Sequence, residues 1–255
     1  MMSSANRTAI VTGASRDVGI GAAVCRALAA QGINIFFTSW RAYDQMMPWG
    51  EDADFPAALQ AEIQAQGVRC EHLEADLSLP ETPQQIMDAA EQSLGPVSIL
   101  VNNATFSVNA GYDTLTPELL DQHYAVNMRG TFLLTTEFVR RFRGDSGGRV
   151  ISLTSGQSVG PMPDELPYIT TKGAVEAFTT SLAAGVAALG ITVNAVDPGA
   201  TDTGWMDADL QQALLKQSPR NRIGQPADAA RLIAFLASDA ADWITGQIIH
   251  SRGGM

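Results

Sequence analysis

The chain has 255 residues, of which 45% are hydrophobic and 17% are charged. This size and composition predict a globular protein with a sizeable core. The formal net charge is −11, and the sequence has no stripe of Lys and Arg that would neutralise phosphates. The charge therefore argues against nucleic acid and against an anionic membrane as main partners.

The sequence gives no sign of a metal site or of a disulfide framework. Its two cysteines, Cys25 and Cys70, lie far apart, and its three histidines are scattered. The N-terminal segment is polar and lacks the apolar stretch of a signal peptide, and no apolar run approaches the length of a membrane span. We therefore expect no bound metal and a cytoplasmic protein.

Short apolar segments that are typical of strands alternate along the chain with amphipathic helical segments. The strand candidates are Thr8–Thr12, Ile33–Ser39, Val68–Ala75, Ser98–Asn102, Arg149–Thr154, Thr192–Val196 and Gln247–His250. The helical candidates are Gly21–Gln31, Ala57–Gln66, Pro83–Leu94, Pro117–Phe142, Tyr168–Leu189 and Pro226–Ser238. Several helical segments begin at Pro or at an N-cap residue, and several end at Gly.

This alternation predicts an α/β fold with a doubly wound parallel sheet of the Rossmann type, about seven strands covered by helices on both faces. No linker or repeat divides the chain, so we expect residues 1–255 to form a single domain. The one irregular stretch is Trp40–Phe55, which is rich in aromatic residues. It could face a ligand, contact another subunit, or be a surface loop that packs its own aromatic side chains.

A glycine-rich turn follows the first predicted strand. It runs from Gly13 through Ser15 and Arg16 to Gly19-Ile20-Gly21, where a helix begins. Such a turn lets backbone N–H groups approach a pyrophosphate at a helix N-terminus, so these residues are candidates for binding a dinucleotide. The alternative is a merely structural turn.

The end of the second predicted strand bears on the choice of dinucleotide. NAD sites usually place a carboxylate there, whereas an Arg accepts the 2′-phosphate of NADP. The sequence around Ser39 has no carboxylate, while Arg16 and Arg41 are both near. A guanidinium suits phosphate through its paired N–H donors. NADP(H) is therefore favoured, with NAD(H) as the alternative if both arginines are ordinary surface residues.

The run from Tyr168 to Lys172 places a phenol and an ammonium one helical turn apart, on one face of a helix. A nearby ammonium favours the phenolate, which would move the Tyr168 pKa toward neutral pH and suit an acid/base catalyst. The alternative is a surface Lys that covers a half-buried Tyr.

These features, in this order, resemble the short-chain dehydrogenase/reductase family, and most closely its 3-oxoacyl-[acyl-carrier-protein] reductase-like branch. The resemblance covers nearly the whole chain. The residues that carry it are Thr12, Gly13, Gly19 and Gly21 in the glycine turn, Asp76 and Leu77 after the third strand, Asn102-Asn103-Ala104-Thr105 after the fourth, Asn127, Ser155, Tyr168, Lys172, and Pro198-Gly199-Ala200-Thr201.

The sequence departs from the family pattern at two places. The glycine turn carries two extra residues, Asp17 and Val18. A carboxylate beside a pyrophosphate is unfavourable, so we expect Asp17 to point to solvent or to an arginine. Thr105 stands where the family usually has a glycine, which adds bulk near the nicotinamide.

The resemblance implies hydride transfer between a nicotinamide and a carbonyl or secondary alcohol, with a 3-oxoacyl thioester as one candidate substrate. Tyr168 would be the general acid or base, Lys172 would lower the Tyr168 pKa and hold the nicotinamide ribose, and Ser155 would bind the substrate oxygen. Asn127 would support a water that links Lys172 to solvent. Asp76, Leu77, Asn103, Ala104, Pro198, Gly199 and Thr201 would line the cofactor site.

Other interpretations stay open. Ser155 could bond only the loop backbone, Asn127 could be a helix kink or a buried polar link, and Asp76 could be a turn residue. The substrate could instead be a sugar, a steroid or a small alcohol, or the protein could bind NADP(H) as a sensor without turnover. The segment Tyr168–Leu189 is rich in small residues, and relatives usually pair there, so we expect a homotetramer.

Overall fold

The computed structural model describes residues 7–254, so the predicted polar N-terminal segment lies almost wholly outside the described residues. The strands are β1 (Thr8–Val11), β2 (Asn34–Ser39), β3 (Cys70–Glu74), β4 (Ile99–Asn102), β5 (Gly148–Leu153), β6 (Ile191–Asp197) and β7 (Ile248–His250). They form one parallel sheet of seven strands in the order β3-β2-β1-β4-β5-β6-β7. All seven strand predictions are confirmed.

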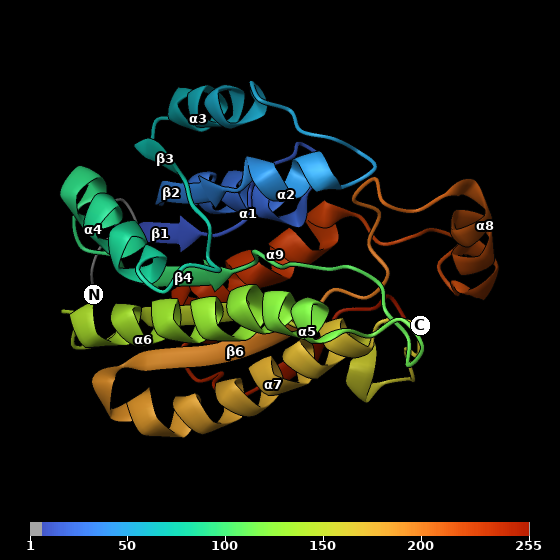
Figure 1. The fold of residues 1–255 in the computed structure, drawn as a ribbon. Helices are drawn as coiled ribbons and strands as arrows, with labels where there is room; N and C mark the ends of the chain where they lie inside the picture. Colours follow the sequence, from blue (N-terminus) through green and yellow to red (C-terminus); the bar gives the residue numbers. More distant parts are fainter. Residues whose placement is uncertain (1–6, 255) are drawn as a thin grey trace.

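Helices cover both faces of this sheet (Figure 1). They are α1 (Ile20–Ala29), α2 (Arg41–Met46), α3 (Phe55–Ala65), α4 (Thr82–Leu94), α5 (Pro117–His123), α6 (Thr131–Arg141), α7 (Leu166–Val186), α8 (Ala208–Gln217) and α9 (Pro226–Ala237). One face packs on α1, α3 and α9, and the other on α4, α6 and α7. The predicted Rossmann-type α/β fold is therefore confirmed.

The first strand shows why the strands are continuously apolar. Ala9 and Val11 belong to the core beneath α1, α3 and α9, while Ile10 between them belongs to the core beneath α4, α6 and α7. Side chains alternate between the two faces of a strand, and both faces of this sheet are buried. The strand order reverses between β1 and β4, which is the position where open α/β sheets bind ligands beyond their carboxyl ends.

The structure corrects the prediction of one continuous helix over Pro117–Phe142. This segment consists of α5, a π-helical stretch (Tyr124–Gly130) and α6. A π-helix adds one residue to a turn, and such stretches occur frequently at functional sites. Asn127 lies in the middle of it.

Two helices were not predicted. The first, α2, lies within the Trp40–Phe55 stretch. The second, α8, stands out from the body of the molecule at the right of Figure 1, and none of its residues is buried. A groove of about 770 Å³ runs beside it, lined by residues of the glycine turn, α1, α8 and α9.

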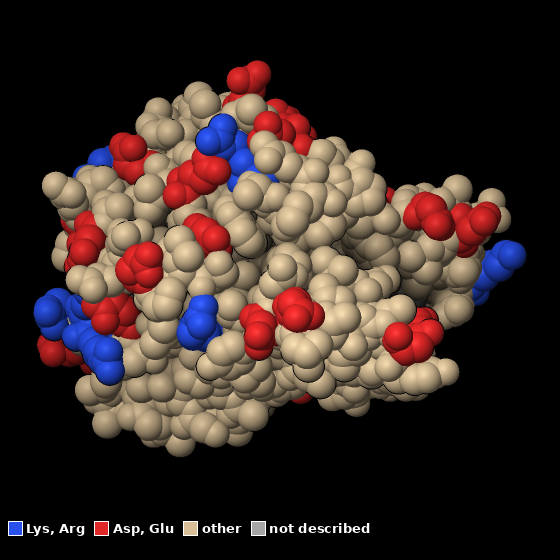
Figure 2. All heavy atoms as spheres, viewed as in Figure 1, with Lys and Arg blue, Asp and Glu red and all other residues tan. Residues whose placement is uncertain are grey.

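Acidic side chains are dispersed over the face seen in Figure 2, with Lys and Arg interspersed among them. Within residues 7–254, no helix is long and apolar enough to cross a membrane.

Candidate functional site

The glycine turn packs directly against the turn that follows β4. The Thr12 hydroxyl accepts hydrogen bonds from the backbone N–H groups of Asn103 and Ala104, each at 3.0 Å. Gly13 has a φ of +74°, and a Cβ there would lie 2.6 Å from the Cα of Ala104. A Cβ at Gly21 would lie 2.6 Å from the Gly13 carbonyl oxygen. The two predicted cofactor-binding turns thus form one tightly packed unit that leaves no room for side chains.

The N-terminus of α1 has the features of an anion-binding site. Its N-cap is Gly19, no side chain accepts a hydrogen bond from its first turn, and that turn contains no acidic residue. By contrast, Thr116 caps α5 and Asp207 caps α8 through their side chains. The first N–H groups of α1 therefore meet no capping side chain, which fits a pyrophosphate held by the helix N-terminus.

Asp17 does not oppose that site. Its carboxylate forms an ion pair with Arg26 at 2.6 Å, and Arg26 also pairs with Glu62 at 2.7 Å. Of the two predicted orientations of Asp17, toward solvent or toward an arginine, the structure shows the second.

Both arginines predicted to hold a 2′-phosphate already have protein partners. The guanidinium of Arg16 stacks over the ring of Trp49 at 4.1 Å, lies 3.7 Å from the Asp44 carboxylate and donates to the Thr203 carbonyl oxygen at 3.0 Å. Arg41 forms an exposed ion pair with Glu74 at 2.6 Å. Any phosphate bound here would share these guanidiniums with carboxylates.

The Trp40–Phe55 stretch packs its own aromatic side chains, which was one of the three predicted alternatives for it. The rings of Trp40 and Tyr43 stack at 6.1 Å, and Tyr43 contacts Phe106 at 5.6 Å. Because Phe106 follows β4, this stretch covers the β4 side of the site.

The acidic residue after β3 forms a turn. Asp76 accepts a hydrogen bond from the Ser78 N–H at 2.7 Å, and Leu77 is buried against Gly130. These contacts agree with the turn alternative for Asp76, and its contact with an adenine stays a prediction.

Ser155 and Tyr168 come together although they belong to different elements. Ser155 follows β5 and Tyr168 lies in the first turn of α7. Burial raises the pKa of Tyr168 to about 12, while a hydrogen bond with Ser155 acts in the opposite direction. The carboxylates of Glu165 and Asp197 raise the Tyr168 pKa further because they disfavour a phenolate.

Lys172 is buried next to Tyr168. Its Nζ lies 5.5 Å from the centroid of the Tyr168 ring and donates to the Leu153 carbonyl oxygen at 2.9 Å. Burial lowers the pKa of Lys172 to about 8. Burial thus outweighs the other influences on Tyr168, and its pKa lies above the ordinary value and not nearer neutral pH. The predicted lowering of the Tyr168 pKa by Lys172 stays a prediction.

Asn127 links three segments. Its Oδ1 accepts from the Phe106 N–H at 2.7 Å and from the Thr105 hydroxyl at 3.2 Å, and its Nδ2 donates to the Phe106 carbonyl at 2.9 Å and to the Thr171 hydroxyl at 3.0 Å. The side chain is thus both part of a helix irregularity and a buried polar link.

The turn after β6 completes the edge of the site. Gly199 has a φ of +66° and its N–H donates to the Asp197 carboxylate at 2.9 Å. The Thr201 hydroxyl donates to the Pro198 carbonyl at 3.2 Å. Sequence reasoning missed Asp197, although a carboxylate at the end of an apolar strand, directly before Pro-Gly, is an unusual placement that could have indicated it.

A family profile described as Enoyl-(Acyl carrier protein) reductase matches residues 13–255. The chain is 50% identical to the uncharacterized oxidoreductase YjdA of Bacillus subtilis, over 100% of this chain and 98% of that protein. It belongs to the short-chain dehydrogenase/reductase family. This confirms the resemblance carried by the glycine turn and the Ser155, Tyr168 and Lys172 motifs.

Other members of the family align over almost their whole length. Identity is 36% to a chloroplastic NADPH-dependent aldehyde reductase-like protein of Arabidopsis thaliana, covering 98% of this chain and 94% of that one. It is 32% to the 3-oxoacyl-[acyl-carrier-protein] reductase FabG of Staphylococcus epidermidis, covering 98% and 99%. A short-chain dehydrogenase of Burkholderia cenocepacia, solved in complex with NADP, has a TM-score of 0.87 and 31% identity, covering 98% and 97%.

The protein is thus an oxidoreductase of the short-chain dehydrogenase/reductase type. Its site brings a serine hydroxyl, a phenol and an ammonium to the carboxyl edge of the sheet, beside the glycine turn. Such a set can deliver a proton to, or remove one from, an oxygen held at the Ser155 hydroxyl.

Proposed function

We propose that this short-chain dehydrogenase/reductase uses NADP(H) to reduce a carbonyl, or oxidise a secondary alcohol, of a small molecule. The observation that carries the proposal is the hydrogen bond of Tyr168 with Ser155, with the buried Lys172 ammonium against the same ring. The bound nicotinamide would supply or accept the hydride. The protein would supply position, a proton and a polar surround for the substrate oxygen.

The proposed roles follow from the contacts. Tyr168 is protonated at neutral pH, since burial raises its pKa, so it is ready to donate a proton to an alkoxide that forms at the substrate oxygen. The Ser155 hydroxyl holds that oxygen within reach of the phenol. Lys172, with a pKa lowered to about 8, would return a proton to Tyr168 and would hold the nicotinamide ribose.

Asn127 chiefly positions the segment after β4 relative to α7. Its four side-chain hydrogen bonds hold the Thr105–Phe106 backbone against α7. The water that would connect Lys172 to solvent through Asn127 stays a prediction, and the bonds of the amide to Phe106 and Thr171 leave it little capacity to hold that water.

The proposed cofactor site lies along the edge formed by the glycine turn and the turns after β3, β4 and β6. Its residues are Gly13, Ser15, Arg16, Gly19, Ile20, Gly21, Arg41, Asp76, Leu77, Asn103, Ala104, Tyr168, Lys172, Pro198, Gly199 and Thr201. The fit rests on the uncapped N-terminus of α1 and on the close approach of glycine backbone. The preference for NADP(H) over NAD(H) is supported by the two arginines and by relatives named for NADPH or solved with NADP.

The named relatives bear on the choice of substrate. Identity is higher to the aldehyde reductase-like relative than to the 3-oxoacyl reductase. A simple carbonyl is therefore as well supported as an acyl thioester. We further propose that residues 1–255 act as one domain within a cytoplasmic homotetramer, because α7 presents small residues suited to close packing between subunits.

The test is a panel of aldehydes, ketones, 3-oxoacyl thioesters and secondary alcohols assayed with NADPH, NADH and their oxidised forms. Consumption of NADPH with at least one carbonyl supports the proposal. Tight NADPH binding without turnover on any member of the panel would instead indicate a sensor.

A further inference from the structure

A buried carboxylate at the end of β6 connects the C-terminal tail to the turn after β6. Asp197 is 1% exposed. Its Oδ1 accepts a hydrogen bond from the Gly199 N–H at 2.9 Å. Its Oδ2 is hydrogen-bonded to the Arg252 guanidinium at 3.0 Å and to the His250 ring at 2.9 Å. A buried carboxylate is stable only when it is paired in this way.

The side chain of Arg252 lies between two glycines. A Cβ placed on Gly199 would lie 3.0 to 3.2 Å from the Cγ, Cα and Cβ of Arg252, and a Cβ on Gly156 would overlap its Nη1. The aliphatic part of Arg252 therefore packs on the turn after β6, while its guanidinium packs on the residue that follows Ser155. The two glycines leave the space that the arginine fills.

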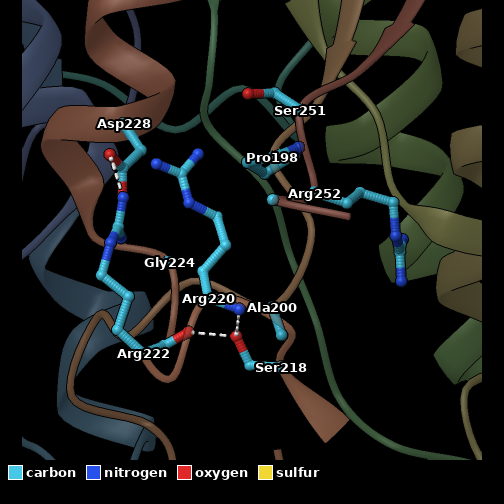
Figure 3. A pocket seen from close by; sticks show the side chains of 10 residues that line it. Pro198, Ala200, Ser218, Arg220, Arg222, Gly224, Asp228, Ser251 and Arg252 are labelled. Carbon is cyan, nitrogen blue, oxygen red and sulfur yellow. Dashed lines mark hydrogen bonds and ion pairs between the residues drawn. The ribbon is translucent and has the colours of Figure 1, made fainter. Parts of the chain in front are cut away.

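Arg252 is separate from the other arginines nearby. A cavity of about 150 Å³ is lined by Arg220, Arg222 and Arg252. Figure 3 shows Arg222 paired with Asp228, with Arg220 beside that pair, whereas the guanidinium of Arg252 extends away from both. Its contacts with Asp197 and Gly156 are thus directed at the edge that bears Ser155 and not at this cavity.

Asp197 and Arg252 lie near the proposed catalytic residues Tyr168 and Ser155. The carboxylate of Asp197 acts on the charge state of Tyr168. Arg252 offsets the charge of that carboxylate, and His250 hydrogen-bonds to it. The other charged or titratable groups that face Tyr168 are Glu165 at the N-cap of α7, Lys172 on α7 and Tyr43 on α2.

We propose that Arg252 is a positioning residue that fixes the Ser155 loop and the Pro198–Thr201 turn relative to each other, with Asp197 as its anchor. This inference rests on the proposed function for its effect on catalysis. The distance between the Ser155 hydroxyl and the Pro198–Thr201 turn is then set by a residue of the C-terminal tail. Misplacement of reacting groups by about 1 Å can cost on the order of a hundredfold in rate.

Hydrogen–deuterium exchange tests the coupling without any cofactor or substrate. Arg252→Ala should lose protection in segments 154–160 and 197–204 together, while the β1 and β4 segments keep wild-type rates. Arg252→Lys should restore part of that protection. Arg143→Ala, at an exposed arginine outside the site, is the matched control. Wild-type exchange in either loop of Arg252→Ala overturns the proposal, as does a uniform loss of protection across the sheet.

A second variant changes Gly156, the residue that the Arg252 guanidinium contacts. Gly156→Ala displaces only the end of the Arg252 side chain, so it should lose protection in the 197–204 segment, which is distant in sequence. In the double variant Gly156→Ala/Arg252→Ala, the effects on that segment should not add, because both changes break the same contact. Additive effects overturn the proposal.

Kinetics separate this inference from the proposed function. On a carbonyl that wild type reduces, Arg252→Ala should lower kcat about tenfold to a hundredfold, with partial rescue in Arg252→Lys. An unchanged kcat overturns the positioning role. If wild type turns over nothing, the proposed function fails, while the exchange result still decides whether Arg252 couples the two loops.

Discussion

The ammonium of Lys172 lies over the ring of Tyr168, 5.5 Å from its centroid, and donates its hydrogen bond to the Leu153 carbonyl oxygen at 2.9 Å. Lys172 is buried and Tyr168 is half-buried. Desolvation moves their pKa values in opposite directions, to about 12 for Tyr168 and to about 8 for Lys172. At neutral pH the phenol is therefore protonated and the ammonium loses its proton easily. This fits the proposed roles of Tyr168 as a proton donor and Lys172 as the group that returns the proton.

The lowered Lys172 pKa predicts a pH-dependent stability. The pKa falls from 10.5 in the unfolded chain to about 8 in the fold, so between these values the unfolded state binds more protons. The contribution of Lys172 to the free energy of unfolding should rise as pH rises through this window and stay level below it. The buried thiols of Cys25 and Cys70, whose pKa values burial raises, act in the opposite direction in wild type and variant alike. Urea unfolding at about pH 7.5 and about pH 9.5 should therefore show a change in wild type that is more positive than the change in Lys172→Met, by on the order of 1 kcal/mol. Equal pH dependence in both proteins would contradict the burial of a charged Lys172.

Tyr168→Phe should separate proton transfer from binding. The ring keeps its shape, but the transferable proton and the hydrogen bond to Ser155 are lost. Turnover should fall by about a hundredfold to ten-thousandfold, while NADPH binding, followed by fluorescence, survives. Lys172→Ala should lower turnover and also weaken NADPH binding, since the ammonium is proposed to hold the ribose. A fully active Tyr168→Phe variant would refute the mechanism.

The Arg41–Glu74 ion pair predicts how cofactor preference can be shifted. Glu74 competes with a 2′-phosphate for the Arg41 guanidinium, which it meets at 2.6 Å. Glu74→Gln should therefore tighten NADPH binding and leave NADH binding unchanged, whereas Arg41→Ala should reduce the preference of wild type for NADPH, which we expect to be about tenfold or more. Fluorescence titration with both cofactors measures this. Glu71→Gln, at a nearby residue of β3, is the matched control. Equal NADPH and NADH affinities in wild type would contradict the proposal that the two arginines favour the 2′-phosphate.

Asn127→Ala should destabilise the protein more than a surface change does. It removes four hydrogen bonds of 2.7 to 3.2 Å and leaves the Phe106 backbone groups without their side-chain partner. The free energy of unfolding should fall by about 2–3 kcal/mol. Asn109→Ala, at an exposed position of the same segment, should change it by less than about 0.5 kcal/mol. Equal unfolding midpoints for the two variants would show that Asn127 does not stabilise the contact between the Phe106 segment and α7.

The proposed homotetramer can be tested by light scattering at micromolar concentration. The expected mass is four times the 27.0 kDa of the chain. A monomer mass would contradict the packing of small residues on α7 between subunits.

The sequence by itself determined the strands, most helices and the motifs, because these depend on local patterns. Apolar runs such as Thr8–Val11, glycines with a required φ or a close approach such as Gly13, and the Tyr168–Lys172 spacing are all contained within a few neighbouring residues. Asp17 was placed correctly as well, since a carboxylate beside a pyrophosphate is unfavourable whatever the fold.

Tertiary structure alone decided how these groups act on one another. The direction of the Tyr168 pKa depends on burial and on Asp197, which a helical spacing does not report. The partners of Asn127 come from segments 21 and 44 residues away in the chain, and Arg252 reaches Asp197 across 55 residues. Desolvation and long-range contacts exist only once the chain has folded, so local sequence cannot give their sign or their strength.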